Sequence, residues 1–217
     1  MNKKSRMKPN AQDPLLTQLF TPMLRKGDLK KGEIIKAAIK LIATQGIGNL
    51  TFESVGKMLG IRRSHVAYHF ESPDEIILKC VQYIVANVQQ MNIEKIKAAA
   101  SGKERLRAYL ESTFEWAESS FEQASVMILF YYFCTLRREW REFHMAIRTA
   151  ALNRLSALLT DGDFVGPSEA SDYATTIHDL LTGAIVGVMT VPQVDQKKAI
   201  AQKKLETIKT ILLILKR

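Results

Sequence analysis

Apolar residues recur along the chain at the three- and four-residue spacing of an amphipathic helix. The first such stripe ends at Gly46 and consists of Ile34, Ile35, Ala38, Ile39, Leu41 and Ile42. A longer stripe follows Ser72-Pro73-Asp74-Glu75, which is typical of a capping box with proline in the first turn. Its apolar positions are Ile76, Ile77, Cys80, Val81, Ile84 and Val85. Because the helical spacing continues beyond residue 80, the pattern predicts an all-α fold.

Between these stripes, residues 51–70 predict two short helices joined by a tight turn. Thr51 is the expected N-cap of the first helix, since its hydroxyl can accept a free amide of the first turn. Gly60 stands where the chain leaves that helix, and glycine adopts the left-handed conformation of such a turn without steric cost. The positions expected to face the core are Val55, Met58 and Leu59 in the first helix and Ile61, Val66 and Phe70 in the second.

The second short helix is expected to turn polar side chains outward. Together with Thr51, the candidate DNA-binding residues are Arg62, Arg63, Ser64, His65, Tyr68 and His69. Such a face suits the major groove, where an arginine can bond the O6 and N7 acceptors of guanine as a pair. An exposed arginine pair is usually solvated surface charge, but its place after a tight turn favours contact with bases or phosphates.

The order, spacing and ends of these helices closely resemble the N-terminal domain of the TetR (tetracycline repressor) family of bacterial transcription regulators. The resemblance covers roughly residues 30–80 and is carried by residues 34–42 with Gly46, then Thr51, Val55, Gly60, Tyr68-His69-Phe70 and Ser72. Two positions at which the resemblance implies phosphate contacts depart from the family pattern. Ala67 stands where the family usually has tyrosine, and Pro73 where it usually has lysine. The neighbouring Tyr68 and a basic N-terminal segment are candidates to compensate.

These features predict three parts: a flexible basic arm over 1–28, a helix-turn-helix DNA-binding domain over 29–75, and a helical ligand-binding and dimerisation domain over 76–217. The first thirty-one residues hold eight lysines and arginines against two aspartates, so this segment can follow phosphates or enter a minor groove. The net charge of +9 favours polyanion partners, although RNA or an acidic membrane would fit the charge equally well.

Composition and hydropathy limit the remaining classes of function. With 217 residues and 47% hydrophobic residues, the chain has room for a sizeable core. Its longest apolar run, residues 126–136, is shorter than the roughly 20 residues of a membrane span, so no membrane partner is expected. The sequence shows no export signal, which predicts a cytoplasmic protein whose Cys80 and Cys134 are reduced and packed as small hydrophobes.

The last two helices are expected near 168–191, with Ser168 as N-cap, and near 195–217. The apolar side expected for the last helix consists of Ile200, Leu205, Ile208, Ile211, Leu212 and Leu215. In the family that the chain resembles, these helices pair with their copies in a second subunit. Gly183 and Gly187 permit such close approach, although a small-residue strip more often reflects packing within one subunit. The residues expected at a homodimer interface are Ile177, Leu181, Ala184, Val188, Ile208 and Leu212.

The middle of the chain is rich in aromatic residues and methionines, which in most proteins fill a core. The family resemblance implies an inducer pocket among these helices. Its candidate residues are Phe114, Met127, Phe130, Tyr131, Trp140, His144 and His178. The two histidines are more often satisfied or solvated than ligand-binding. Because no cluster of opposite charge is evident there, a small apolar or aromatic effector is expected.

Other chemistry finds little support in the sequence. His65 and His69 have a spacing that could hold a metal, but no nearby cysteine or carboxylate supplies a third ligand. The sequence contains no nucleophile elbow, phosphate loop or dinucleotide fingerprint, so we expect no enzyme, no cofactor and no metal. The sequence favours a ligand-responsive repressor that binds a palindromic double-stranded operator as a homodimer. An architectural or non-inducible DNA-binding protein, and a scaffold with a degenerate helix-turn-helix, remain as alternatives.

Overall fold

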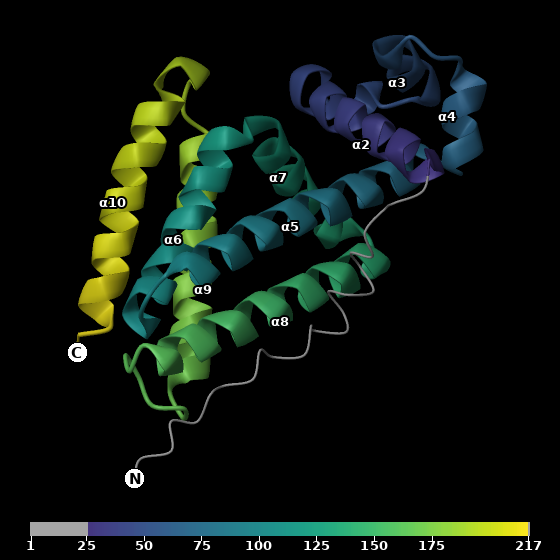
Figure 1. The fold of residues 1–217 in the computed structure, drawn as a ribbon. Helices are drawn as coiled ribbons and strands as arrows, with labels where there is room; N and C mark the ends of the chain where they lie inside the picture. The colour runs from purple at the N-terminus through teal and green to yellow at the C-terminus, as the bar shows by residue number, and fades with distance from the viewer. Residues whose placement is uncertain (1–25, 217) are drawn as a thin grey trace.

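The computed structural model describes residues 26–216, and within that range the chain is helical with no strand (Figure 1). The helices are α2 Lys26–Gln45, α3 Phe52–Leu59, α4 Arg63–His69, α5 Pro73–Ala98, α6 Gly102–Ser119, α7 Phe121–Leu136, α8 Arg138–Asp161, α9 Ala170–Met189 and α10 Gln196–Ile214, with short 3-10 turns at Ile47–Asn49 and Gln193–Asp195. The predicted all-α class is confirmed. Most of the predicted basic arm lies outside the described residues.

Helices α2, α3 and α4 gather at one end of the molecule, and α5 runs from them into the other helices (Figure 1). Gly46, with a φ of 81°, ends α2 at the position predicted. Helix α5 starts at Ser72, whose hydroxyl accepts the Glu75 N–H at 3.2 Å. The capping box predicted there is incomplete, because the Glu75 carboxylate accepts the N–H of Glu71 instead of that of Ser72.

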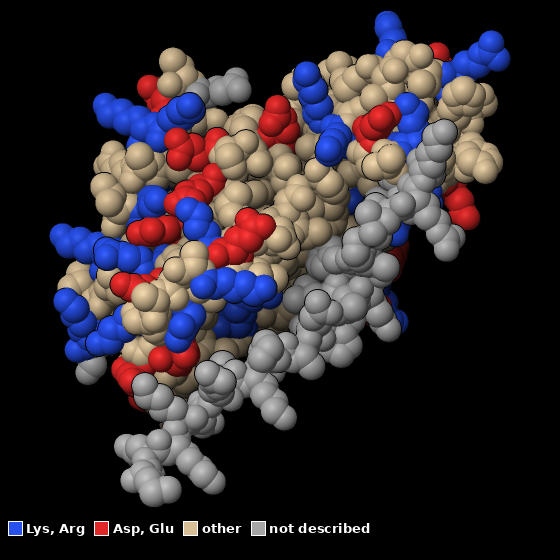
Figure 2. Space-filling model, viewed as in Figure 1, with Lys and Arg blue, Asp and Glu red and all other residues tan. Residues whose placement is uncertain are grey.

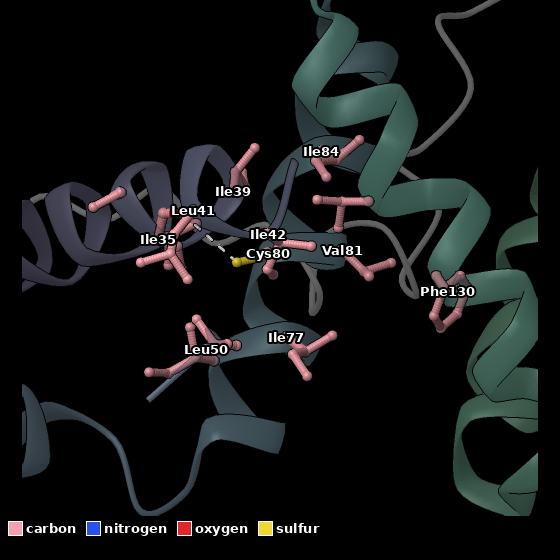
Figure 3. Close-up of a cluster of buried hydrophobic side chains, with 14 of the residues drawn as sticks. Ile35, Ile39, Leu41, Ile42, Leu50, Ile77, Cys80, Val81, Ile84 and Phe130 are labelled. Atoms are coloured by element: carbon pink, nitrogen blue, oxygen red, sulfur yellow. Dashed lines mark hydrogen bonds between the residues drawn. The ribbon is translucent and has the colours of Figure 1, made fainter. Parts of the chain in front are cut away.

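Buried side chains form one core around the first helices and another among the later ones. The first core joins α2, α3, α4 and the N-terminal half of α5 to α7, so it crosses the predicted domain boundary after residue 75. Figure 3 shows the isoleucines of α2 facing α5, with Phe130 on the neighbouring α7. The buried Cys80 thiol of α5 donates to the Ile35 carbonyl of α2 at 3.6 Å. A movement of α5 or α7 would therefore be transmitted directly to α2.

The second core joins α6, α8, α9 and α10. Its largest fully buried side chains are Leu106, Leu110, Phe114, Leu155 and Leu159. Helix α6 begins with a capping box, in which Ser101 and Glu104 bond each other's backbone N–H groups. None of the helices in residues 26–216 combines the length and the apolar character that a membrane crossing requires.

Three side chains lie differently from the sequence-based expectation. Met58 is 37% exposed, because the buried side of α3 runs through Val55 and Gly56. Leu205 is 73% exposed, since the buried stripe of α10 follows the spacing of its other apolar residues and leaves this leucine outside. Ser168 is not an N-cap, because α9 begins two residues later, after Glu169, without a side-chain cap. These three predictions were wrong.

Candidate nucleic-acid interface and ligand cavity

The first helix of the helix-turn-helix is fixed by a complete capping box. The Thr51 hydroxyl accepts a hydrogen bond from the Ser54 N–H at 3.0 Å, and the Ser54 hydroxyl accepts one from the Thr51 N–H at 2.9 Å. The same Ser54 hydroxyl lies 2.6 Å from the Asn49 carbonyl oxygen, which ties α3 to the preceding turn. The predicted cap at Thr51 is confirmed, and its partner is Ser54.

Two glycines with different roles allow the tight turn into α4. Gly60 has φ 65° and ψ 29°, the left-handed conformation that the sequence predicts. Gly56 is buried inside α3 and allows the backbone at the start of α4 to approach α3 closely. A Cβ at this position would lie 2.8 Å from the Ile61 carbonyl oxygen and 3.4 Å from the Arg63 nitrogen. The Ile61 N–H also donates to the Gly56 carbonyl at 2.9 Å. Gly56 is not among the residues predicted from the sequence, although a glycine inside a helical pattern is a usable signal.

Helix α4 has one buried face and one exposed face. Val66 is fully buried and Phe70 is 2% exposed, so both hold the helix against the core as predicted. The exposed side chains are Arg62, Arg63, Ser64, His65, Ala67 and Tyr68. Neither arginine forms an ion pair within residues 26–216, and Tyr68 is 85% exposed. His69 differs from the others, since it is half-buried and packs edge-on to Tyr68 with 5.1 Å between ring centroids.

Positive charge from α2 reaches the end of α4. Partial burial, followed by the charges of Lys31, His65 and Lys30, lowers the pKa of His69 below its ordinary value. Lys30 is held by Glu33 at 2.6 Å. Figure 2 shows Lys and Arg side chains projecting from the end of the molecule that carries α3 and α4. This end therefore combines exposed hydrogen-bond donors with positive charge, as a DNA-binding surface requires.

A cavity of about 150 Å³ lies among α5, α6, α7, α8 and α9. Three of the predicted pocket residues line it, namely Met127, Tyr131 and His178. The other lining side chains include Ile84, Val85, Val88, Gln89 and Asn92 of α5, Tyr109 and Trp116 of α6, Ile147 and Ala151 of α8, and Leu181, Thr182 and Ile185 of α9. The walls are mostly apolar, with polar groups at separate positions.

The remaining predicted pocket residues do not line this cavity. Phe130 and Trp140 stack on each other with ring centroids 6.0 Å apart in a packed aromatic cluster. Phe114 is fully buried in the second core. The His144 ring packs edge-on against Tyr131 at 5.3 Å, behind the wall that Tyr131 forms. These four assignments are corrected, because aromatic content alone does not distinguish a cavity wall from a filled core.

Buried polar side chains on α5 and α6 form one polar region of the cavity. Asn92 is 3% exposed, and its side-chain oxygen accepts the Ser112 hydroxyl at 2.5 Å. Gln89 accepts a hydrogen bond from Arg154 through its side-chain oxygen. Tyr109, close to Arg154, lines the same space. Sequence reasoning missed these residues, although polar residues within the apolar stripe of a buried helix are a usable signal.

A second polar region lies where α8 meets α9. Arg148 Nη1 lies 3.0 Å from His178 Nδ1 and 2.8 Å from Asp179 Oδ1. Burial, followed by the Arg148 charge, lowers the pKa of His178, so its ring is neutral near pH 7. Burial is also the main cause that raises the pKa of Tyr131, which Arg148 partly opposes.

One helix connects the cavity to the DNA-binding end. Helix α5 lines the cavity between Ile84 and Asn92, and its N-terminal part packs on α2 in the first core. In the first turn of α5, the Asp74 carboxylate accepts a hydrogen bond of 2.5 Å from the Arg137 guanidinium. Arg137 lies at the junction of α7 and α8. The Arg137 guanidinium lies 5.4 Å from the centre of the Trp140 ring. These contacts connect helices that line the cavity with the helix-turn-helix.

Most residues predicted at a dimer interface are buried within the single chain. Ile177, Leu181, Val188 and Ile208 are 0 to 6% exposed and belong to the second core, whereas Ala184 and Leu212 are half-buried. The four buried residues therefore pack within the subunit, because the apolar stripes of α9 and α10 face the body. On the outer side of α9, Gly183 and Gly187 are exposed, and a Cβ at either would meet no atom within 4 Å.

Within residues 26–216, no group of three His, Cys, Asp or Glu side chains is placed to hold a metal ion, and this includes the surroundings of His65 and His69. The family described as "Bacterial regulatory proteins, tetR family" matches residues 34–80, which run from α2 into α5 and enclose the capped turn and α4. Residues 34–80 thus carry the helix-turn-helix of the tetR family of bacterial regulatory proteins.

Curated relatives of the chain are also transcriptional regulators. The HTH-type transcriptional regulator YerO of Bacillus subtilis is 33% identical over 88 residues, which cover 40% of this chain and 30% of YerO. The HTH-type transcriptional regulator BetI of Rhizobium meliloti is 19% identical over 110 residues, 51% of this chain and 54% of BetI. The chain thus spans about a third to a half of the length of these curated relatives.

Solved structures of other regulators share the fold over most of the chain. A transcriptional regulator from Saccharomonospora viridis, solved in complex with choline, aligns with a TM-score of 0.74 and 19% identity over 84% of this chain and 95% of that one. AibR, solved in complex with isovaleryl coenzyme A and operator DNA, aligns with a TM-score of 0.61 and 14% identity. The alignment covers 81% of this chain and 96% of the AibR chain.

Proposed function

We propose that the chain is a ligand-responsive transcriptional repressor that binds a palindromic DNA operator as a homodimer in the bacterial cytoplasm. The observation that carries this proposal is the exposed face of α4, which begins with Arg62 and Arg63 and is held by the capped α3 and the Gly60 turn. A rigid short helix with unpaired arginines at its start is suited to the major groove, where arginine recognises guanine.

The charges around α4 support different DNA contacts for the two ends of this helix. Arg62 and Arg63 are placed to reach base edges, whereas Lys30, Lys31 and His69 lie together at the other end of α4 and are placed for phosphates. Pro73 provides neither a side-chain charge nor a backbone N–H at the start of α5. The cluster from α2 and the basic N-terminal residues supply the phosphate contacts in its place.

The dimer uses the outward surfaces of α9 and α10. Gly183 and Gly187 allow a second helix to approach the α9 backbone closely. Leu205 and Leu213 of α10 are 73% and 54% exposed, and a partner would remove them from water. A charged side chain at the α9 surface, as in Gly187→Arg, should yield folded monomers in light scattering, and Thr149→Arg on α8 is the control. A parent chain that is monomeric at micromolar concentration would reject this arrangement.

The cavity supports a small apolar or aromatic effector. Its volume of about 150 Å³ suits a molecule of roughly the size of a substituted benzene. Regulators with a similar fold were solved with small ligands, choline in one case and isovaleryl coenzyme A in another. An effector between α5 and α9 would shift α5, and with it α2 and the recognition helix. Operator affinity falls when the two recognition helices of the dimer no longer match successive major grooves, about 34 to 36 Å apart.

The experiment replaces the two arginines one at a time and measures binding to DNA taken from beside the gene itself. Arg62→Ala and Arg63→Ala should each weaken specific binding by about 1 to 3 kcal/mol in fluorescence anisotropy, without a change in melting temperature. Arg107→Ala on α6 is the control, because it removes an exposed charge of the same kind away from α4. If the two α4 variants bind like this control, α4 does not read DNA.

A further inference from the structure

Two arginines contact residues of the cavity wall, Arg148 at His178 and Arg154 at Gln89. Among the described side chains that line the cavity, none is acidic. The charge of Arg148 adds to the effect of burial in lowering the pKa of His144, and it partly offsets the rise that burial causes in the pKa of Tyr131. Arg154 partly offsets the rise that burial causes in the pKa of Tyr109. Arg148 is paired with Asp179, whose side chain is 57% exposed. A ligand in the cavity therefore meets a neutral to positive environment.

The contact between Arg148 and His178 determines which ring nitrogen of the histidine can serve a ligand. A guanidinium only donates hydrogen bonds, so Nδ1 of His178, 3.0 Å from Arg148 Nη1, must be the acceptor. The neutral ring then carries its proton on Nε2. Asp179 Oδ1 is also 3.5 Å from Nδ1, but this longer contact would need the opposite tautomer and gives way to the Arg148 bond. His178 lines the cavity, and its Nε2–H has no acceptor among residues 26–216.

The Tyr131 hydroxyl adds a second donor to the same region. Tyr131 lines the cavity, and its hydroxyl has no hydrogen-bond partner among the described residues. Among residues 26–216, every side-chain nitrogen or oxygen that is fully buried has a hydrogen-bond partner. The Tyr131 hydroxyl therefore keeps accessible surface, and its residue lines the cavity. Thr182, one turn after His178 on α9, lines the cavity beside these two donors.

We propose that the effector is a small carboxylic acid with an apolar or aromatic body, whose carboxylate binds His178 Nε2–H and the Tyr131 hydroxyl in front of Arg148. The apolar body lies against Val85, Val88 and Ile185. This inference rests on the proposed function, because it names the ligand class of the same cavity. A carboxylate accepts hydrogen bonds from both donors, and hydrogen bonds to an ionised group are stronger than those between neutral groups.

A quaternary cation such as the choline of the Saccharomonospora viridis structure fits this cavity less well. The faces of Trp116, Tyr109 and Tyr131 could attract a cation. However, a permanent charge taken out of water needs an opposite charge nearby, and none of the described side chains that line this cavity is acidic. The cavity therefore selects against the ligand class that a similar fold binds elsewhere.

The experiment compares three probes of one shape and different charge, benzoate, benzyl alcohol and benzylamine, with choline as a fourth. Affinity for the full-length protein is measured by calorimetry, and release of promoter DNA by anisotropy. Benzoate should bind about ten- to a hundredfold more tightly than benzyl alcohol, while benzylamine and choline bind more weakly than the alcohol. Arg148→Gln should abolish the preference for benzoate, and Arg148→Lys should keep most of it. Arg141→Gln, which removes an exposed charge from the same helix, should leave the preference unchanged.

The outcomes separate the ligand class from the function. If choline or benzylamine binds best, or if no probe binds at millimolar concentration, the carboxylic acid assignment is wrong. Promoter binding by the unliganded protein tests the DNA-binding function independently in the same experiment. If benzoate binds best but the preference survives in both Arg148→Gln and a His178→Ala variant, the carboxylate lies elsewhere and the proposed site is overturned.

Discussion

The approach of α4 to Gly56 makes Gly56→Ala an informative substitution. The new methyl carbon would lie 2.8 Å from the Ile61 carbonyl oxygen and 3.4 Å from the Arg63 nitrogen. Both neighbours are backbone atoms, so they cannot rotate away. Either the turn before α4 moves by several tenths of an ångström, or the hydrogen bond from the Ile61 N–H to the Gly56 carbonyl is strained.

Two opposing terms set the magnitude. Overpacking of this kind costs about 1 to 3 kcal/mol. Alanine regains about 1 kcal/mol over glycine inside a helix, which leaves a net loss of about 0 to 2 kcal/mol. In a chain of 217 residues, each kcal/mol lowers the melting temperature by about 2 to 4 °C. Because the displaced atoms begin the recognition helix, affinity for promoter DNA should fall about tenfold or more.

Gly32→Ala is the matched control, since it makes the same change in helix α2 of the same domain. A Cβ at Gly32 meets no atom within 4 Å, so only the helix-propensity gain of about 0.5 to 1 kcal/mol remains. Gly32→Ala should therefore raise the melting temperature and leave promoter affinity in anisotropy unchanged, whereas Gly56→Ala should lower both. A Gly56→Ala protein that melts at or above the parent temperature and binds promoter DNA equally well would refute the close approach of α4 to α3.

Three further predictions follow from the capped helix, the histidines and the basic N-terminal residues. Thr51→Ala removes the acceptor of the Ser54 N–H and should lower the free energy of unfolding by about 1 kcal/mol in urea titrations, whereas an unchanged midpoint would show that the cap is idle. The pKa values of His69, His144 and His178 are all lowered, so these histidines take up protons in the unfolded chain before they do so in the folded one. The free energy of unfolding should therefore be fully present above about pH 6.5 and fall as the pH drops toward 5. A melting temperature that rises over this range would contradict the lowered pKa values. Deleting residues 1–25 removes five lysines and arginines, which should weaken binding to all DNA sequences and flatten its salt dependence, whereas an unaltered slope would mean that these residues do not contact phosphates.

The sequence predicted the DNA-binding end well because that end depends on local signals. The Thr51 cap, the glycines at 46 and 60, and the inward positions of Val66 and Phe70 each follow from short-range chemistry. The exposure of Met58 was missed, because apolar spacing alone could not show that Val55 and Gly56 take the buried side of so short a helix.

The cavity and the interface between subunits depend on long-range packing, which one sequence does not reveal. Phe130 and Trp140 have the composition of a pocket wall, yet they fill the core because α7 and α8 bring them together. Asn92 lies 20 residues before Ser112 in the chain and becomes a cavity residue only when α5 packs on α6. Apolar stripes show which face of a helix is buried, but they do not tell whether that face packs within the subunit or against a partner.

Hydroxyl-radical footprinting on the promoter region of the gene tests whether α4 reads DNA from a dimer. We expect two protected half-sites with palindromic sequence, centred about 34 to 36 Å apart along the duplex. Protection should disappear when Arg62 and Arg63 are both replaced by alanine and persist in the Arg107→Ala control. Uniform coating of the fragment, or a footprint that survives the double replacement, would show that α4 does not read DNA in this way.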